Sequence, residues 1–353
     1  MGLCNVLILL LAVGVGIIGF GHRQLVVNPI DFEPVNLDGK VAIVTGATAG
    51  IGLETARKLA EWNCTVIVMA RNVKKGERVK KSLLQSLPAS STGTIEVMEG
   101  ALDNTESIRN FVAAFKKKNL PLHILLNNAG MFRGTSFQAA SNGIEITYQV
   151  NHLGPFLLTE LLIPALKETK GESRVVMVSS SLHYAGVLDK SAYSVDNKNA
   201  NPENMRSFDQ SYSDTKYMNV LYANALNEKL KEEGVKGITV NSVHPGFVQS
   251  ELDQNLGSTL QHFGKLLREY VARSTSEGSV AQVTVATHPS LKGVSGRYFE
   301  DHCIKDLCTS CKVASTLSLF KNCTSGGRVT PADGTQAKEN FKWIYETSEA
   351  LTK

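Results

Sequence analysis

The sequence predicts an α/β protein built on a single doubly wound parallel sheet of about seven strands, and two observations lead to this prediction. From residue 40 onward, short runs rich in Val, Ile and Leu alternate with longer stretches of helical character. These runs are nearly continuous, which is typical of parallel strands buried on both faces. In addition, a glycine-rich turn follows the first run, at the position where such sheets bind phosphate groups.

The predicted elements alternate regularly along the chain. The expected strands cover residues 40–45, 65–70, 94–99, 124–127, 174–178, 238–243 and 296–299. The expected helices cover residues 51–61, 73–87, 105–118, 143–168, 213–233, 276–286 and 341–351. Because right-handed crossovers place the carboxyl ends of all strands at one edge, we expect ligands in the crevice outside that edge.

The composition is that of a globular protein with a full core, and the length suits one large α/β domain or two small ones. The 353 residues are 42% hydrophobic and 20% charged, and the net charge is +4. This charge is too small, and the runs of Lys and Arg are too short, to indicate nucleic-acid binding. We expect the domain at residues 38–300, with a polar insertion at 187–210 and a C-terminal extension at 301–353.

The first 22 residues differ from the rest of the chain. No charged side chain occurs from Leu3 to Gly21, a length that suits a bilayer-spanning helix. No basic residue precedes the run, unlike in a secretory signal peptide, whereas Arg23 follows it. We therefore expect an anchor at 1–22, a linker at 23–37 and a domain facing the cytosol, at the endoplasmic reticulum or a lipid-droplet surface. A cleaved signal peptide and a buried helix are the alternatives.

The cysteines do not indicate a metal site. Six cysteines in a chain of this length are too few for a disulfide scaffold. Cys308 and Cys311 have a C-x-x-C spacing, but no second ligand pair lies at a spacing typical of structural zinc. We expect no metal, and no role is assigned to Cys303, Cys308, Cys311 and Cys323.

The turn after the first strand predicts a nucleotide site. Residues 45–52 read Thr-Gly-Ala-Thr-Ala-Gly-Ile-Gly. Glycines permit a tight turn there, and the helix N-terminus offers free N–H groups to a pyrophosphate. The spacing is G-x-x-x-G-x-G, which differs from the common G-x-G-x-x-G. The residues expected to contact the cofactor are Gly46, Thr48, Gly50, Ile51 and Gly52.

The end of the second strand predicts which dinucleotide binds. An acidic residue there would accept hydrogen bonds from the ribose and favour NAD, but this chain has Arg71 followed by Asn72. A guanidinium matches the 2′-phosphate of NADP(H), so we predict that cofactor; a solvated arginine is the alternative. Asp103, after the third strand, is placed to meet the adenine, to cap the following helix, or both.

Tyr212 and Lys216 predict acid–base chemistry. They are four residues apart on an expected helix and so share one face. A nearby ammonium is expected to lower the pKa of a tyrosine, which is about 10 in water. This spacing often occurs by chance, so its significance depends on two other residues. Ser180 closes the fifth strand, and Asn151 precedes Gly154-Pro155, where we expect the helix to be irregular.

Taken together, these segments resemble the classical short-chain dehydrogenases/reductases over residues 38–300, and the resemblance implies a Rossmann fold. The motifs that occur in the family's order are the glycine turn, Asn127-Asn128-Ala129-Gly130, the Asn151 segment, Ser180, Tyr212-x-x-x-Lys216 and Pro245-Gly246. The implied catalytic tetrad is Asn151, Ser180, Tyr212 and Lys216, with Ser179 and Ser181 less favoured than Ser180. The implied further cofactor contacts are Asn128, Ala129, Tyr212, Lys216, Pro245, Gly246, Val248 and Ser250.

Two residues indicate a branch of the family, and one spacing departs from the family's compact members. Arg71 and His183 are similar to the retinol dehydrogenase-like branch, which includes membrane-anchored polyprenol-oxidising relatives. The spacing from Ser180 to Tyr212 is longer than in compact members of the family, so residues 187–210 are expected to loop out. This departure affects the expected shape of the pocket and leaves the tetrad intact.

The expected function is hydride transfer between an apolar alcohol, or its aldehyde or ketone, and C4 of the NADP(H) nicotinamide. Tyr212 is the expected acid or base, Ser180 positions the substrate oxygen, and Lys216 holds the ribose. Asn151 is expected to order a water-linked proton path. The substrate could be a retinoid, a steroid, a fatty aldehyde or a polyprenol; a non-enzymatic NADPH-binding scaffold is the other alternative. The expected partners are this lipophilic substrate and a membrane, and a homodimer is one option.

Overall fold

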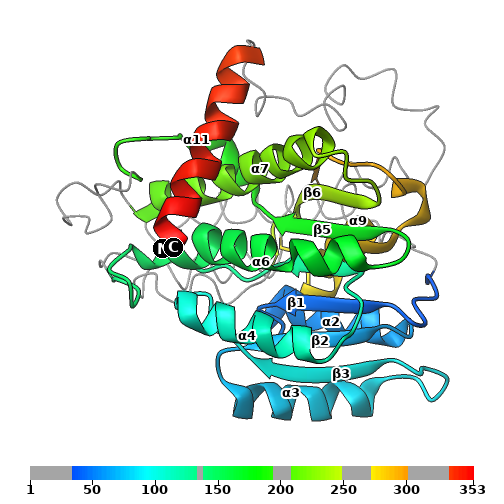
Figure 1. Cartoon of the computed structure of the whole chain (residues 1–353). Helices are drawn as coiled ribbons and strands as arrows, with labels where there is room; N and C mark the ends of the chain where they lie inside the picture. Colours follow the sequence, from blue (N-terminus) through cyan, green and yellow to red (C-terminus); the bar gives the residue numbers. More distant parts are fainter. Residues whose placement is uncertain (1–33, 133–137, 194–207, 249–271, 301–333) are drawn as a thin grey trace, which may run out of the picture.

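A seven-stranded parallel sheet forms the centre of the protein, in the order β3-β2-β1-β4-β5-β6-β7 (Figure 1). The computed structural model describes residues 34–132, 138–193, 208–248, 272–300 and 334–353. The strands are β1 (Val41–Thr45), β2 (Thr65–Ala70), β3 (Thr94–Glu99), β4 (Ile124–Asn127), β5 (Ser173–Val178), β6 (Ile238–His244) and β7 (Tyr298–Glu300). The chain leaves β1 towards β2 and β3, and then returns to β4 on the other side. This reversal confirms the doubly wound fold.

Helices cover both faces of the sheet (Figure 1). One face packs against α2 (Gly50–Glu61), α3 (Val73–Ser86) and α9 (Thr275–Thr287). The other packs against α4 (Thr105–Lys117), α6 (Gly154–Glu168) and α7 (Phe208–Glu232). Successive side chains of β1 point to opposite faces of the sheet. Ala42 and Val44 pack in the layer with α2, α3 and α9, whereas Val41 and Ile43 pack in the layer with α4, α6 and α7.

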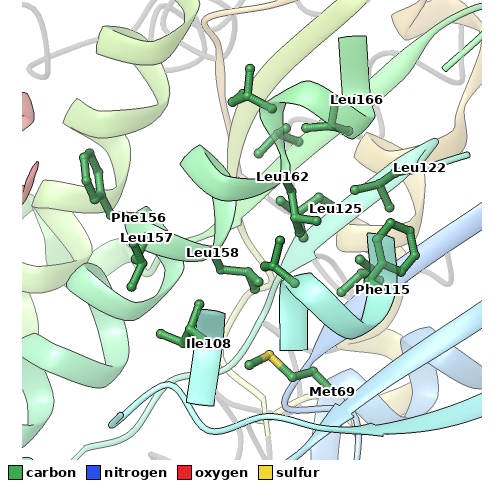
Figure 2. Close-up of a cluster of buried hydrophobic side chains, with 14 of the residues drawn as sticks. Met69, Ile108, Phe115, Leu122, Leu125, Phe156, Leu157, Leu158, Leu162 and Leu166 are labelled. Atoms are coloured by element: carbon green, nitrogen blue, oxygen red, sulfur yellow. The ribbon is translucent and has the colours of Figure 1, made fainter. Parts of the chain in front are cut away.

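The layer between the sheet and helices α4 and α6 is made of closely packed aliphatic and aromatic side chains. Figure 2 shows Met69, Phe115, Leu125 and Leu158 within it. Phe115, Leu125 and Leu158 are at most 1% exposed, and burial of one such side chain contributes about 2 kcal/mol. This packing fixes α6, and with it the turn that precedes α6, against the carboxyl ends of the strands.

The helix expected over residues 143–168 is interrupted in the structure. A short α5 (Ile146–Tyr148) leads into a π-helical turn, η1 (Gln149–Leu153), before α6 begins. The first helical residue is Ile146 rather than the expected residue 143. The Glu145 carboxylate caps α5 there, accepting from the N–H groups of Thr147 and Tyr148, both at 2.8 Å. Pro155 has no N–H, so it cannot bond the carbonyl four residues earlier, that of Asn151. The irregularity expected at Gly154-Pro155 is confirmed.

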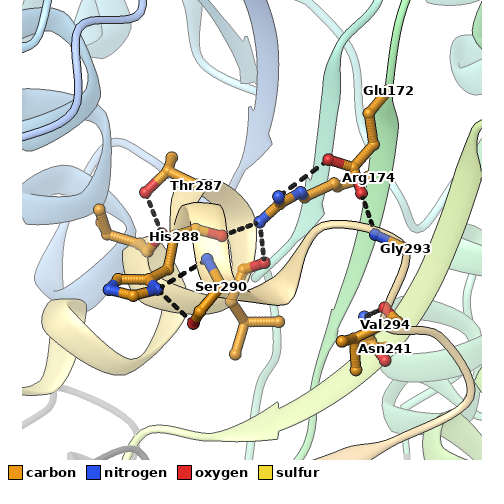
Figure 3. Close-up of polar contacts among 10 residues, drawn as sticks. Glu172, Arg174, Asn241, Thr287, His288, Ser290, Gly293 and Val294 are labelled. Carbon is orange, nitrogen blue, oxygen red and sulfur yellow. Dashed lines mark hydrogen bonds and ion pairs between the residues drawn. The ribbon is translucent and has the colours of Figure 1, made fainter. Parts of the chain in front are cut away.

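An arginine at the opposite edge of the sheet holds α9 in place (Figure 3). The Arg174 guanidinium donates to the carbonyl oxygen of His288 at 3.0 Å and that of Val285 at 3.4 Å. It also pairs with Glu172 at 2.9 Å, and the other carboxylate oxygen of Glu172 accepts from the Gly293 N–H. A cation at a helix C-terminus is favourable. The network therefore secures α9 at one end, while its other end lies near the strand carboxyl ends.

The last helix, α11 (Gly334–Thr352), packs on α6 and α7 (Figure 1). It is longer than the helix expected over 341–351. Ile344 on this helix is fully buried, so the end of the C-terminal extension is part of the folded body.

Several expectations lie outside the described residues: the anchor at 1–22, most of the linker, Ser250, and the four cysteines between 301 and 333. The insertion at 187–210 is described only up to Tyr193 and again from Phe208. In the part of the chain that the structure describes, no helix combines the length and apolar character needed to cross a membrane.

Candidate functional site

The glycine turn between β1 and α2 forms a cradle with exposed backbone. Gly46 has φ +67°, and a Cβ on Gly52 would lie 2.5 Å from the Gly46 carbonyl oxygen, so neither position accepts a side chain without strain. The N-cap of α2, Ala49, makes no side-chain capping bond, and the first turn holds no acidic residue. The first N–H groups and the positive end of the helix dipole are thus available to an anion, and Thr48, Gly50 and Ile51 lie at this end.

A polar clamp holds this turn against β4 and α9. The Asn128 amide donates to the Thr45 carbonyl at 2.9 Å and accepts from the Gln282 amide at 3.0 Å. The Ala129 N–H donates to the Thr45 hydroxyl at 2.9 Å. Thr55 on α2 donates to Gln282 at 3.1 Å. Sequence reasoning missed Gln282, because the same helix carries several other polar side chains and nothing in the sequence distinguishes this one.

At the end of the crevice beyond β2, the Arg71 side chain is 78% exposed and pairs with Asp103 at 3.2 Å. Both residues line a pocket of about 770 Å³ beyond β2 and β3. Asn72 caps α3, its side chain accepting from the Lys75 N–H at 2.9 Å. The cap of α4 is Asn104 rather than Asp103, so the capping role considered for Asp103 is wrong. The Asp103 carboxylate instead faces the guanidinium.

The segment after β6 borders the same crevice. Gly246 has φ +88°, which turns the chain directly after Pro245. Val248 forms a bridge with Arg273 and packs against Gly278 at the start of α9. The segment is therefore tied to the helix whose Gln282 holds the glycine turn.

Tyr212 and Lys216 project from the first turns of α7 towards the end of β5. Their exposures are 7% and 3%. The Tyr212 hydroxyl hydrogen-bonds with Ser180. The Lys216 Nζ lies 5.5 Å from the centroid of the Tyr212 ring and donates to the Val178 carbonyl at 3.1 Å. Phe132 packs edge-on against the tyrosine, with 5.4 Å between ring centroids.

The three serines after β5 have different surroundings. Ser179 is buried and donates to the Lys216 carbonyl at 2.7 Å, which joins β5 to α7. Ser180 caps the following turn, accepting from the Leu182 N–H at 3.2 Å, and its side chain reaches Tyr212. Ser181 is exposed. Only Ser180 among them therefore has a hydroxyl beside that of Tyr212.

Burial dominates the protonation of this pair. It raises the pKa of Tyr212 to about 12, although the hydrogen bond from Ser180 acts in the opposite direction. Burial also lowers the pKa of Lys216 to about 8. The expectation that the ammonium lowers the pKa of the tyrosine is wrong for this structure. Desolvation of the phenolate is the larger effect, and the Lys216 Nζ is engaged with the Val178 carbonyl.

Asn151 joins the π-turn to the loop after β4. Its side-chain oxygen accepts from the Met131 N–H at 2.7 Å, and its amide donates to the Met131 carbonyl at 2.9 Å. The amide also lies 3.3 Å from the Thr215 hydroxyl on α7. Met131 and Thr215 carry no sequence signal for this role, because their contribution comes from the backbone and from a common hydroxyl.

His183 is buried beside the same strand end. Its Nδ1 lies 2.6 Å from the Ser180 carbonyl oxygen, and burial lowers the pKa of the ring. The histidine therefore fixes the main chain that carries the Ser180 hydroxyl. Within the described ranges, no group of three or more His, Cys, Asp or Glu residues could hold a metal ion.

The arrangement has close relatives among known proteins. The sequence pattern of the short chain dehydrogenase family matches residues 40–216. The chain is 35% identical to retinol dehydrogenase 11 of Homo sapiens, over 79% of this chain and 82% of that protein. It is 36% identical to polyprenol dehydrogenase of Mus musculus, over 77% and 79% respectively. It is 38% identical to short-chain dehydrogenase TIC 32 B, chloroplastic, of Brassica napus, over 75% and 82%.

Solved structures agree on the fold. A short chain dehydrogenase from Salmonella enterica superposes with a TM-score of 0.56 at 18% identity, covering 77% of this chain and 99% of that one. A short-chain type dehydrogenase/reductase from Mycobacterium marinum gives a TM-score of 0.57 at 19% identity, covering 75% and 94%. This family binds nicotinamide cofactors, and its dehydrogenases act on small molecules. The chain therefore belongs to the short-chain dehydrogenase family, in its retinol dehydrogenase-like branch, and is an oxidoreductase.

Proposed function

We propose that the protein interconverts an apolar alcohol and its aldehyde or ketone, with NADP(H) as the cofactor. The observation that carries this proposal is the placement of the Ser180 and Tyr212 hydroxyls side by side, with Lys216 next to them, at the same sheet edge as the uncapped glycine turn. Two adjacent hydroxyls can both bond one substrate oxygen, and the turn suits a pyrophosphate.

The residues of the proposed tetrad have separate tasks. When bound, NADP(H) supplies the hydride acceptor or donor. Tyr212 gives the proton to the substrate oxygen in reduction and takes it in oxidation, while Ser180 polarises that oxygen. Lys216 holds the cofactor ribose, next to the Tyr212 ring. Asn151 orders a water-linked proton path, and the pairs it forms with Met131 hold it in place.

The proposed contacts of the cofactor follow the crevice from end to end. Arg71 recognises the 2′-phosphate, and Asp103 lies next to the adenine. The remaining contacts come from three groups of residues: the glycine turn, the backbone of Asn128 and Ala129, and the segment from Pro245 to Ser250. Support for NADP(H) over NAD(H) is the exposed guanidinium at the end of β2, where no acidic residue stands.

The proposed substrate is lipid-like. Four of the exposed large apolar side chains in the described residues follow β5 or β6, beside the proposed centre: Leu182, Tyr184, Val187 and Phe247. The names of two relatives, retinol dehydrogenase 11 and polyprenol dehydrogenase, point to the same class. Steroids and fatty aldehydes are apolar as well, so the substrate panel described below includes them.

We also propose that residues 1–22 anchor the protein, with the domain on the cytosolic face of the endoplasmic reticulum or a lipid droplet. The uncharged run from Leu3 to Gly21 supports the anchor, and Arg23, the first charged side chain after it, supports the cytosolic orientation. Carbonate extraction tests it: an anchored protein stays with the membranes, and release into the supernatant would contradict the anchor. The homodimer stays a prediction, which sedimentation velocity in detergent checks.

The test of the function is a substrate panel with full-length protein in detergent. Retinol, a polyprenol, a steroid alcohol, a fatty alcohol and their carbonyl products are assayed with NADP(H) and with NAD(H). We expect turnover with at least one lipid pair and a preference for NADP(H). Binding of NADPH without turnover on any substrate would favour the scaffold instead.

A further inference from the structure

The main-chain carbonyl of Asn151 is held by a side chain from another helix. In a regular helix this carbonyl would accept from the N–H of residue 155, but that residue is proline and has none. The Asn219 amide takes this place and donates to the carbonyl at 2.9 Å. The turn that carries Asn151 is therefore bonded to α7, one helical turn after Lys216.

Asn219 is in turn bonded to His152, which is completely buried. The Nδ1 of His152 lies 3.1 Å from the Asn219 side-chain oxygen, and its Nε2 lies 2.9 Å from the Ser348 hydroxyl on α11. Burial lowers the pKa of His152 to about 4, so the ring is neutral at physiological pH. A neutral imidazole has one donor and one acceptor nitrogen.

The partners determine which nitrogen carries the proton. A carbonyl oxygen only accepts, so the Asn219 group bonded to Asn151 is the NH₂, and the oxygen of Asn219 faces His152. That oxygen also only accepts, so Nδ1 of His152 is the protonated nitrogen. Nε2 then accepts from the Ser348 hydroxyl. The bonds run in one direction, from Ser348 through His152 and Asn219 to the Asn151 carbonyl.

Helix α11 is fixed at two further points, which sets the place of Ser348. The Lys229 ammonium on α7 lies 4.3 Å from the centroid of the Tyr345 ring and donates to its hydroxyl. Arg109 on α4 donates to the Thr352 carbonyl at 2.8 Å, at the C-terminus of α11. In Figure 1, α11 crosses over α7 and α6.

The other side of Asn151 faces the proposed centre. Its side chain makes two bonds with the Met131 backbone, directly after Gly130. A Cβ on Gly130 would lie 3.1 Å from the Lys216 ammonium, so this loop closely approaches the lysine. A shift of the π-turn would therefore move both Asn151 and the loop beside Lys216.

We propose that Ser348, His152 and Asn219 are positioning residues for Asn151, and that α11 is thereby part of the catalytic architecture. This inference rests on the proposed function. Loss of the Ser348 link loosens the turn without touching a substrate or cofactor contact, so kcat falls while the KM values stay the same.

The first test compares Ser348→Ala with Thr352→Val. Both remove a buried hydroxyl from α11, but the Thr352 hydroxyl bonds only within that helix. We expect Ser348→Ala to lower kcat about fivefold, with both KM values within about twofold of wild type. Thr352→Val should keep the wild-type kcat. Equal kcat values for the two variants, or a loss in proportion to the fall in melting temperature, would overturn the proposal.

A double-mutant cycle tests whether the hydroxyl acts through the histidine. In His152→Asn the shorter side chain can still reach Asn219 but not Ser348. Adding Ser348→Ala to that variant should leave kcat unchanged, because the link is already cut. An additive loss in the double variant would show that Ser348 acts by another route.

Hydrogen exchange separates this proposal from the proposed function. The Met131 N–H donates to Asn151, so its exchange should quicken about fivefold in Ser348→Ala and not in Thr352→Val. If wild type turns over no substrate but Met131 responds in this way, only the proposed function fails. If the enzyme is active and Met131 exchange is unchanged in Ser348→Ala, the positioning proposal fails; this readout also serves if His152→Asn does not fold.

Discussion

The two ends of the crevice place charged groups in opposite environments. At the end proposed for the adenosine, the Arg71 side chain is 78% exposed and its pair with Asp103 is open to water. At the other end, Lys216 is 3% exposed and Tyr212 7%. Water screens the first pair, so it contributes little to stability and its guanidinium can exchange partners. Desolvation controls the second pair, so its protonation depends on what surrounds it.

This difference separates the proposed recognition of the cofactor from the proposed chemistry. An exposed cation can bind a phosphate without much change in the fold, whereas a buried lysine is retained at the expense of stability. Substitutions at the two ends should therefore differ in the size of their effects and also in which property they change.

The largest effect is expected from Tyr212→Phe at the buried end. It removes the group proposed to transfer the proton, so turnover should fall by about 10³-fold or more. NADPH binding, followed by fluorescence titration, should be nearly unchanged. Retained turnover would remove Tyr212 from the mechanism.

Lys216→Met should lower activity and raise stability. Burial lowers the pKa of Lys216 from 10.5 to about 8, so the ionised lysine opposes folding at pH 7 by an amount on the order of 3 kcal/mol. Between pH 8 and 10.5, Lys216 is protonated in the unfolded chain but neutral in the folded protein, so the unfolded state binds more protons. The free energy of unfolding of the wild type, relative to that of the variant, therefore rises with pH over this range. Urea unfolding at pH 7 and at high pH measures both effects. A variant less stable than wild type at pH 7 would contradict this reading of the burial.

Arg71→Asp tests the exposed end. The variant should lose about 100-fold in its preference for NADP(H) over NAD(H), because a carboxylate repels the 2′-phosphate and accepts from ribose hydroxyls. The comparison is the ratio of kcat/KM values for the two cofactors. Wild type without any 2′-phosphate preference would show that the role given to Arg71 is wrong.

The smallest effect is expected from Asp103→Asn. Freeing Arg71 from its partner should tighten NADPH binding about threefold at low salt and less at high salt. The free energy of unfolding should change by less than about 0.5 kcal/mol. Weaker NADPH binding in this variant would indicate that Asp103 contributes more through the adenine than through Arg71.

Most elements of the sheet could be predicted because their signals are local. The strand runs, the glycine turn and the break before Pro155 depend on neighbouring residues, and the structure has all of them, although the last strand, β7 (Tyr298–Glu300), begins later than the expected 296–299. Asp103 and Asn104 show the limit of such reasoning. Both are acceptable helix caps, and in the structure Asn104 caps α4 while Asp103 pairs with Arg71, a residue distant in the sequence.

By itself, the sequence determined the strand and helix pattern, the bare helix N-terminus and the shared face of Tyr212 and Lys216. These follow from side-chain periodicity and backbone sterics, which act over a few residues. The tertiary structure decided which serine meets Tyr212, the direction of both pKa shifts, and the place of α11 over His152. These depend on burial and on contacts between residues far apart in the chain, such as His152 and Ser348, which no local pattern encodes.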